Sequence, residues 1–387
     1  MSKYKFSAPM PYSKKDIDNL LNINYKVNKS EINSLFFSLP SNCDLFTGFE
    51  QYRNRIFNSN WDFWKALISH TLEKGIDFIY LINNPARLSI EQSDFEIKLD
   101  KLDKLLNELQ KIGVNKLRVS NNRLISYINK YYPQFILYAS TSFEYKIISE
   151  YKNFMFLHPY VKQIVPSHDL IKNYALLKNL RKLLKDTEIE LIVNEGCLNG
   201  CPVREAHAGE LLDNPIKCKD CDILSNYFHV SYFCSVIQER NHIKSLLKSN
   251  IIYPWEIKEY AKIGINNFKF VGRDAYFDSI NIAINGYLNY LKGIDNVKNI
   301  ENKPISTFSH HYRTDNILKQ LTVKDYKKYL PNINYFKKYG HLCASRCGME
   351  CRYCYKCAEK IQKELEKQVK KSENKPHYVP ACTMKNF

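Results

Sequence analysis

Cysteine is the residue type whose number and spacing in this chain most clearly indicate chemistry. The sequence has 12 cysteines, and all except Cys43 lie in two groups, at residues 197–234 and 343–382. The N-terminal segment contains no apolar stretch of the signal-peptide type, so we expect a cytoplasmic protein. A reducing compartment disfavours disulfides, so clustered thiols there indicate a metal centre. Cys43, which stands alone, is expected to be a small buried side chain.

The first cysteine group follows an apolar segment, residues 189–193, which predicts a buried strand. Its members are Cys197, Cys201, Cys218, Cys221 and Cys234. Gly196 directly precedes Cys197, and Gly200 directly precedes Cys201. Glycine at these positions lets the backbone curl closely around a ligand. Four thiolates suit either a tetrahedral zinc ion or an iron–sulfur cluster. Spacing alone leaves open which four of the five cysteines would be ligands.

The second group lies towards the C-terminus. Its members are Cys343, Cys347, Cys351, Cys354 and Cys357, and Cys382 could add a ligand from beyond them. The spacing of Cys347, Cys351 and Cys354 matches the motif of radical S-adenosylmethionine enzymes, but that motif normally follows the first strand of a barrel. A second cluster for electron delivery, or a zinc knuckle using Cys354 and Cys357, fits this position better. A buried stripe of thiols is a further alternative, because on an ideal helix the five positions span about 120°.

The elements that must position these cysteines alternate between short apolar runs and longer amphipathic segments. Strands are predicted at residues 78–82, 116–119, 135–138, 163–165, 189–193 and 268–271, and helices between them include residues 101–112, stopped by Gly113, and 169–184. Such alternation predicts βαβ units and a mainly parallel sheet. Because the sequence contains neither GxGxxG nor GxxxxGK[ST], we favour a (β/α)8 barrel of the TIM type over an open doubly wound sheet.

Three regions are expected along the chain. The barrel with the first cysteine group occupies residues 1–295, and a polar connection follows at residues 296–340. A Cys-rich C-terminal segment occupies residues 341–387 and includes a helix at residues 358–371, in which Glu and Lys are spaced as they are on a solvated surface.

Polar residues follow several of the predicted strands, and in a closed barrel these strand ends form the mouth where the chemistry takes place. They are Asn83, Asn84, Ser120, Asn121, Ser140, Thr141, Ser142, Ser167, Asn194, Glu195 and Arg273. Close to the first cysteine group, Glu195, Arg204 and His207 are candidate catalytic residues that could act as acid, base or anion-binding groups. Each of the three could equally have a structural role, as a loop cap, an ion-pair partner or a surface histidine.

Several of these segments resemble the peptidase U32 family. Residues 189–201, a strand followed by a small glycine motif and paired cysteines, are similar to the signature region of that family. IGINNFKFVGRD, at residues 263–274, is similar to its final-strand motif. YASTSFEY, at residues 138–145, and IVPSHDL, at residues 164–170, also resemble its barrel strands. The resemblance therefore extends from about residue 75 to the end of the final-strand motif.

The resemblance implies a fold, a cofactor and a class of reaction. Members of the family with established roles are oxygen-independent hydroxylases that act on tRNA, rRNA or a quinone precursor, and several hold a [4Fe–4S] cluster through four cysteines. Matched residue by residue, the implied cluster ligands are Cys197, Cys201, Cys218 and Cys234, with Cys221 able to replace Cys218. Lys269 and Arg273 match the two cations of the final-strand motif, where they could hold an anionic substrate.

The chain departs from the family pattern at two places. Asn194, Glu195 and Gly196 stand where many members have a His-Gly pair, and Val271 replaces an acidic residue of the final strand. We therefore expect an iron–sulfur redox enzyme with one cluster, or two if the second cysteine group also binds one, and a substrate of its own, either RNA or a small aromatic or quinone-like molecule. An electron donor or a partner subunit is a further candidate partner.

Two other functional classes stay open. A peptidase is suggested by the family name, although the sequence has no HExxH motif. A zinc-stabilised RNA-binding protein would fit the formal net charge of +17, but Lys far outnumbers Arg, as in a solvated surface that has no nucleic-acid partner. A membrane span is not expected, because no run of about 18 apolar residues occurs.

Overall fold

The structure is a computed structural model of the chain. It describes residues 4–22, 30–38, 61–83, 92–196, 199–201, 204, 247, 249–272, 277–293, 322, 324, 328, 333–345 and 352–373. No helix in this part of the chain is long and apolar enough to cross a membrane.

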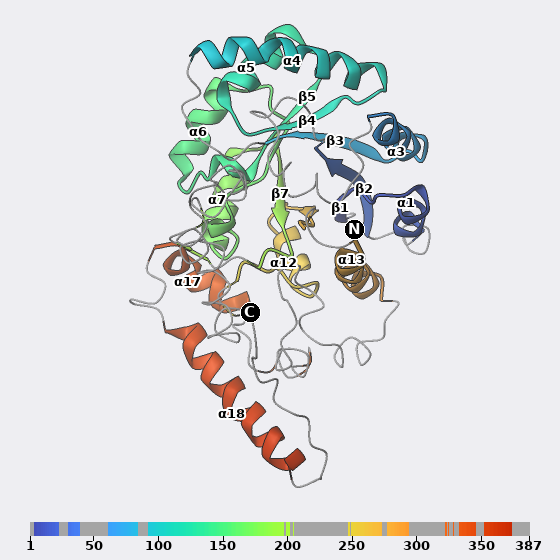
Figure 1. The fold of residues 1–387 in the computed structure, drawn as a ribbon. Coiled ribbons are helices and arrows are strands. Elements are labelled where there is room, and N and C mark those ends of the chain that lie inside the picture. Colours follow the sequence, from blue (N-terminus) through green and yellow to red (C-terminus); the bar gives the residue numbers. More distant parts are fainter. Residues whose placement is uncertain are drawn as a thin grey trace, which may run out of the picture.

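Eight parallel strands form a closed barrel in which each strand pairs with the next along the chain and the last pairs with the first (Figure 1). The strands are β1 (Tyr4–Pro9), β2 (Ser30–Phe37), β3 (Asp77–Ile82), β4 (Lys116–Val119), β5 (Ile136–Ala139), β6 (Gln163–Ile164), β7 (Glu188–Ile192) and β8 (Asn267–Lys269). The (β/α)8 barrel predicted from the alternating sequence pattern is therefore confirmed.

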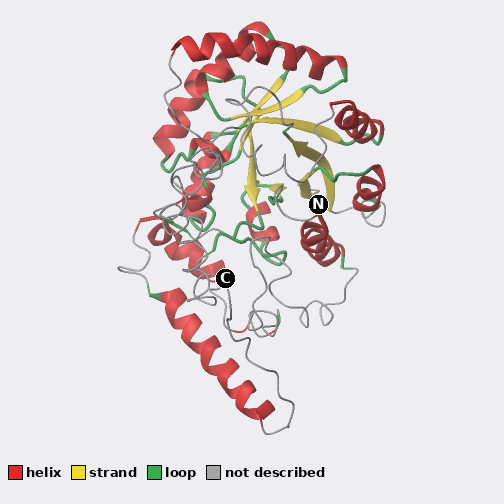
Figure 2. Ribbon diagram, in the orientation of Figure 1, coloured by secondary structure: helices red, strands yellow, loops and turns green. Residues whose placement is uncertain are grey.

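Helices surround the sheet, as Figure 2 shows. They are α1 (Lys14–Leu21), α3 (Trp61–Glu73), α4 (Gln92–Lys111), α5 (Asn122–Tyr131), α6 (Ile148–Leu157), α7 (Tyr174–Leu183), α12 (Ile257–Ala261) and α13 (Phe277–Lys292). Two short 3₁₀ turns, η2 (Thr141–Phe143) and η3 (His168–Leu170), follow β5 and β6. Beyond the barrel lie α17 (Ile333–Ser345) and α18 (Tyr353–Glu373).

The main differences from the predicted elements have local causes. β1 and β2 are absent from the predicted set because polar residues interrupt their apolar positions, as in YKFSAP. The helix predicted from residue 169 begins instead at residue 174, because the side chain of Asn173 accepts a hydrogen bond from the Leu176 N–H and caps the helix there. Gly113, with a positive φ of 84°, ends α4 as expected.

Alternation along the strands divides the apolar side chains between two faces of the sheet. Tyr80 of β3 belongs to the main buried cluster, which also contains helix residues such as Trp64. Its neighbour Leu81 belongs to a separate small cluster with Phe36 and Tyr138. Since successive strand residues point to opposite faces, the main cluster fills the space between sheet and helices and the small cluster lies inside the barrel.

The interior of the barrel also holds a buried ion pair. Arg118 Nη2 lies 2.6 Å from Glu190 Oε2, and both side chains are at most 3% exposed. Arg118 also donates to Gln163 Oε1 at 2.5 Å, and the Ser7 hydroxyl donates to Glu190 Oε1 at 2.8 Å. Polar side chains from β1, β4, β6 and β7 are thus joined across the barrel beneath its mouth.

The C-terminal region is attached to the barrel through α17, which packs on α7 and η3. Lys337 Nζ lies 2.6 Å from Glu259 Oε2, and Lys172 Nζ lies 5.0 Å from the centre of the Phe336 ring. A Cβ atom on Gly340 would collide with the backbone oxygen of Lys172, so the two segments touch with no room for a side chain. α17 therefore runs through the expected end of the polar connection at residue 340 and into the Cys-rich segment.

The first turns of α18 pack against α17 and the main apolar cluster of the barrel. The ring of Tyr353 stacks on that of Tyr335 in α17, with 3.7 Å between their centres. Cys357, Ala358 and Ile361 are buried and belong to the main apolar cluster. The rest of the helix runs away from the barrel (Figure 1).

Breaking the interior ion pair is expected to destabilise the barrel. Glu190→Gln leaves the Arg118 charge buried without its counter-ion, so we expect a loss of about 3–5 kcal/mol in the free energy of unfolding. The double variant Arg118→Met/Glu190→Leu removes both charges and should recover most of that loss. Urea unfolding followed by circular dichroism measures both values. A double variant no more stable than Glu190→Gln would contradict this account.

Gly340→Val is expected to loosen α17 from the barrel, because the new side chain overlaps the backbone of Lys172. The free energy of unfolding should fall by about 1–3 kcal/mol, as is usual for overpacking. Lys338→Val places the same residue at an exposed position of α17 and serves as the control for helix propensity. Equal losses in the two variants would show that the contact at Gly340 does not hold the helix in place.

Candidate functional site

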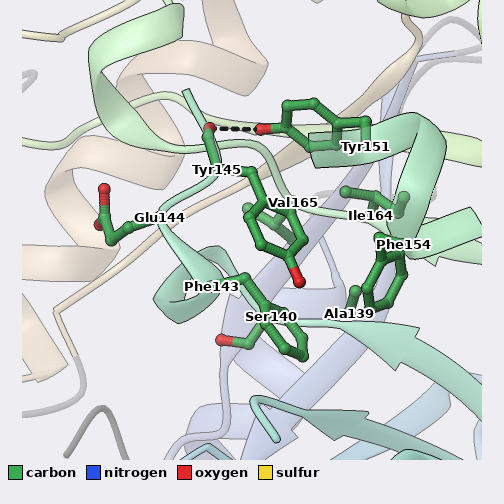
Figure 3. A pocket seen from close by; sticks show the side chains of 9 residues that line it. All are labelled: Ala139, Ser140, Phe143, Glu144, Tyr145, Tyr151, Phe154, Ile164 and Val165. Atoms are coloured by element: carbon green, nitrogen blue, oxygen red, sulfur yellow. Dashed lines mark hydrogen bonds between the residues drawn. The ribbon is translucent and has the colours of Figure 1, made fainter. Parts of the chain in front are cut away.

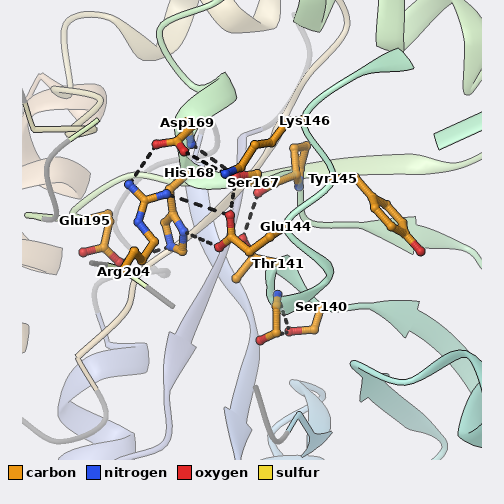
Figure 4. Close-up of polar contacts among 12 residues, drawn as sticks. Ser140, Thr141, Glu144, Tyr145, Lys146, Ser167, His168, Asp169, Glu195 and Arg204 are labelled. Carbon is orange, nitrogen blue, oxygen red and sulfur yellow. Dashed lines mark hydrogen bonds and ion pairs between the residues drawn. The ribbon is translucent and has the colours of Figure 1, made fainter. Parts of the chain in front are cut away.

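Charged and hydroxyl side chains gather at the carboxyl ends of three neighbouring strands (Figure 4). Glu144 and Lys146 follow β5, Ser167, His168 and Asp169 follow β6, and Glu195 and Arg204 follow β7. Because parallel strands of a closed barrel end at one mouth, segments far apart in sequence meet there. We call these seven residues the mouth network.

His168 lies between two carboxylates in this network. Its Nε2 atom is 3.2 Å from Glu195 Oε2, and its Nδ1 atom is 3.4 Å from Glu144 Oε1. Burial by itself would lower the pKa of the imidazole, but the two carboxylates outweigh that effect and raise the pKa of His168 to about 10. At neutral pH the ring is therefore an imidazolium, with its positive charge shared between two anions.

Glu144 has an uncommon backbone conformation. Its φ of 50° lies in the left-handed region, and among the described residues it is the one non-glycine residue with a positive φ. Burial would raise the pKa of its carboxyl group, but contacts with His168, Ser167 and Arg204 together lower that pKa to about 2. The Ser167 hydroxyl donates to Glu144 Oε2 at 2.6 Å. Such a conformation persists only where neighbouring contacts hold it, and it is common at functional sites.

Asp169 connects the network to the loop after β7. Its carboxylate accepts a hydrogen bond from the Gly200 N–H at 2.7 Å and forms an ion pair with Arg204 Nη2 at 2.8 Å. The Arg204 N–H in turn donates to the Cys201 carbonyl at 3.4 Å. The segment that carries the Cys201 thiol is thus fixed to a carboxylate on the neighbouring strand end.

The residues predicted as metal ligands are only partly described. Cys201 is half-buried at the mouth, and Gly200 beside it has a φ of 65° and no atom within 4 Å of the position a Cβ would take. The predicted ligands Cys197, Cys218, Cys221, Cys234, Cys347 and Cys351 lie outside the described residues, as do Cys43, Cys382, His207 and Arg273. Cys343 lies on α17, and its side chain is not described.

Two cysteines of the second group are described on α18. Cys354 Sγ lies 3.8 Å from the Leu247 carbonyl oxygen. Cys357 is buried, and this burial raises the pKa of its thiol. Among the described residues no group of three or more His, Cys, Asp or Glu side chains is placed to hold a metal ion.

Other strand-end residues from the sequence analysis have structural contacts. The Asn194 amide donates to the Val271 carbonyl at 2.9 Å and accepts from the Val271 N–H at 2.8 Å, which joins the ends of β7 and β8. Asn121 caps α5. Lys269 is buried inside the barrel with its Nζ 4.2 Å from the centre of the Phe36 ring. Its amino group therefore lies beneath the mouth, on the strand where a substrate-binding cation was predicted.

A small pocket lies beside the mouth network, between β5, β6 and α6 (Figure 3). Its aromatic walls include Phe143, Tyr145 and Phe154, whose ring centres are 5.1–5.7 Å apart. Tyr151 closes one side and donates its hydroxyl to the Tyr145 carbonyl at 2.8 Å. Glu144 lines the pocket and also belongs to the network, so an apolar surface adjoins the charged groups.

Glu195 and Arg204 were predicted from the sequence, and the structure brings them together in the mouth network. Their partners Glu144, His168 and Asp169 were not predicted, although all three lie in the segments YASTSFEY and IVPSHDL. The signal that could have identified them is their position just after predicted strands, which they share with the hydroxyl residues. With three carboxylates and three cations, the network is close to neutral and can orient a polar substrate and hold a proton on His168.

Comparisons with known proteins place this geometry in context. No protein-family model matches the chain. The chain is 22% identical over 353 residues to a protein of Methanocaldococcus jannaschii named as an uncharacterized protease, and the match covers 90% of this chain and 94% of that protein. This similarity along almost the whole chain, together with the motifs at residues 189–201 and 263–274, supports the resemblance to the peptidase U32 family.

Two of the solved structures that match this chain do so with TM-scores below 0.5. A U32 peptidase gives a TM-score of 0.40 at 11% identity, covering 58% of this chain and 84% of that chain. N-acetylneuraminate lyase from Fusobacterium nucleatum gives 0.37 at 11% identity, covering 94% and 98%. The barrel assignment rests on the closed order of the strands in this chain.

His168 is expected to make stability fall in mildly alkaline solution. Its folded pKa of about 10 exceeds the ordinary value of about 6.5, so its stabilising effect is complete below pH 6.5 and is lost as the pH rises towards 10. The free energy of unfolding of wild type should exceed that of His168→Gln most at pH 6, and the difference should shrink by pH 9.5. Urea unfolding at several pH values measures it.

His158→Gln is the matched control for this experiment. Burial lowers the pKa of His158, so this residue contributes no pH dependence above pH 6.5. Its difference from wild type should stay constant from about pH 7.5 to 9.5, where the His168→Gln difference is expected to shrink. A constant difference for His168→Gln as well would show that His168 is not held in the charged form.

Proposed function

We propose that this chain is a redox enzyme of the U32 type, in which an iron–sulfur cluster held by cysteines of the first group acts beside the mouth network on a substrate at the barrel mouth. The observation that carries the proposal is the attachment of the Cys201 loop to the network. Gly200 donates to Asp169, and Arg204 both pairs with Asp169 and donates to the Cys201 carbonyl. The Cys201 thiol, which we propose as a metal ligand, is thus held at the same end of the barrel as the charged network.

The described residues fit such a cluster. Cys201 is half-buried, as a cluster ligand near a substrate would be, and the space beside Gly200 leaves room for a bulky group against the backbone. The remaining ligands would come from Cys197, Cys218 or Cys221, and Cys234. When bound, a cluster of this kind supplies one-electron chemistry at the mouth, and a second centre at the C-terminal cysteines would serve for electron delivery.

The protein's own side chains would hold and move protons and orient the substrate. His168 keeps a proton between Glu144 and Glu195, and Glu195 is the carboxylate on the strand that leads to the cysteines. A carboxylate paired with an imidazolium can exchange a proton with a bound substrate. Arg204 and Lys146 supply positive charge at the mouth.

A peptidase is the second candidate, because the archaeal relative is named as a protease. Peptide hydrolysis by a serine would need a hydroxyl activated by a base. In the described mouth, the Ser167 hydroxyl donates to Glu144, and the two ring nitrogens of His168 face carboxylates. This geometry disfavours a serine nucleophile activated by His168. Cleavage of casein by metal-free protein, abolished in His168→Gln, would instead favour the peptidase.

The metal centre can be tested by anaerobic purification followed by iron, sulfide and zinc analysis. Wild type is expected to contain about four irons per cluster with equal sulfide, and to absorb broadly near about 400 nm. Cys197→Ala/Cys201→Ala should lose one such centre entirely. If a second centre is present, Cys351→Ala/Cys354→Ala should remove it while the first remains. Zinc without sulfide, or unchanged iron in the first double variant, would overturn the proposal.

Cys357→Ala provides the control within the second cysteine group. The Cys357 side chain packs in the main apolar cluster, and its raised pKa disfavours the thiolate that binds metal. The variant should therefore keep the iron content of wild type and lose only some stability, since a buried side chain has been made smaller. Loss of iron in this variant would assign Cys357 to a metal centre.

A further inference from the structure

Basic side chains dominate the exposed surface of α18. Five of the six described residues that are exposed from residue 352 to residue 373 are basic, and the sixth is Glu359. The basic ones are Arg352, Lys356, Lys360, Lys363 and Lys367, which we call the α18 stripe. Their spacing of four, four, three and four residues is that of one helix face.

The stripe is narrow and long. At about 100° per residue, the five positions fall within an arc of about 80°, and at about 1.5 Å per residue they extend over about 22 Å. Glu359 lies at the edge of this arc, next to Arg352. Successive cations about one turn apart make a linear array, and a chain with regularly repeated negative charges is its natural complement.

The opposite face of the helix fixes the stripe in place. Cys357, Ala358 and Ile361 are buried in the main apolar cluster, and Tyr353 stacks on Tyr335 of α17. α17 in turn packs on η3, which carries His168 and Asp169 of the mouth network. The base of α18 is therefore attached to the side of the barrel where its mouth lies, and a ligand lying along the stripe would extend from there.

The residue types of the α18 stripe favour a nucleic acid as its partner over a membrane or a protein. A surface helix that binds membranes inserts apolar side chains, but the apolar side chains described on α18 are buried or half-buried, and the described large apolar residues that are exposed lie on other elements. A protein interface would need aromatic or aliphatic anchors at its centre. Binding to a phosphate backbone needs only positive charges along its path. Four of the five cations are Lys, which bind phosphates as point charges and lack the planar fork that reads a base edge.

We propose that the α18 stripe is a docking surface for the phosphate backbone of a single-stranded nucleic acid. This binding surface does not depend on the proposed function. Binding through the stripe is independent of base sequence. The stripe serves to raise the local concentration of this polyanion beside the mouth of the barrel.

The test measures binding of a fluorescein-labelled, mixed-sequence single-stranded RNA of about 20 nucleotides by anisotropy. Wild type is compared with Lys356→Glu/Lys360→Glu/Lys363→Glu at several salt concentrations. We expect Kd to rise at least about tenfold and the slope of log K against log salt to fall by about 2, as expected when three phosphate contacts to a single strand are lost. The corresponding Lys→Gln triple variant should show a smaller change in the same direction.

Lys152→Glu/Lys182→Glu/Lys185→Glu is the matched control, because these three lysines are exposed on α6 and around the end of α7 and the change in net charge is the same. Its Kd should stay within about threefold of wild type, since distant surface charges are screened. Equal weakening by both triple variants, no RNA binding by wild type, or stripe-dependent binding only to vesicles containing anionic lipid would overturn the inference.

Iron analysis of the same samples keeps the two proposals apart. All the lysine variants should retain the iron and sulfide content of wild type, which also shows that they fold. RNA binding that persists in Cys197→Ala/Cys201→Ala would support the docking surface even if no cluster were found. Iron in wild type together with failure to bind RNA would leave the proposed function standing and remove this inference alone.

Discussion

His168 lies between the carboxylates of Glu144 and Glu195, and this contact joins the loops that follow three successive strands. The partners depend on one another: the imidazolium helps to lower the pKa of Glu144, and the carboxylates of Glu144 and Glu195 raise the pKa of His168. The strained backbone of Glu144 is held by the same contacts. Asp169, next to His168, extends the arrangement to the loop of Cys201. The mouth is thus built as one electrostatic unit.

A second set of charges lies beneath the mouth, inside the barrel. Arg118 and Glu190 pair across strands β4 and β7, and Lys269 lies over the Phe36 ring. Burying charges in a barrel interior is unfavourable unless they are paired, so this layer fixes the relative positions of the strands rather than adding much stability. Strands held in this way give the mouth network a rigid base, which a site needs if its groups are to keep their geometry.

The C-terminal region completes the side of the mouth formed by η3 and α7. α17 touches the backbone at Lys172 so closely that Gly340 has no space for a side chain, and α18 buries Cys357 in the same apolar cluster as the barrel helices. The region is therefore a part of the barrel assembly. Its other face is free to carry charge, and there the sequence places a regular series of lysines. One helix thus combines attachment to the mouth with a surface suited to a polyanion.

The sequence by itself determined the barrel, because apolar runs alternating with amphipathic segments can bury their surfaces only as a sheet covered by helices. It also determined where the cysteines and Glu195 stand relative to strand ends. It did not identify β1 and β2, whose polar residues weaken the apolar pattern. Only the tertiary structure decided that Glu144, His168 and Asp169 meet Glu195 and Arg204, since such contacts join residues up to about 60 positions apart through closure of the sheet. Local pattern specifies elements, whereas the partners of a charged side chain depend on which strand ends become neighbours.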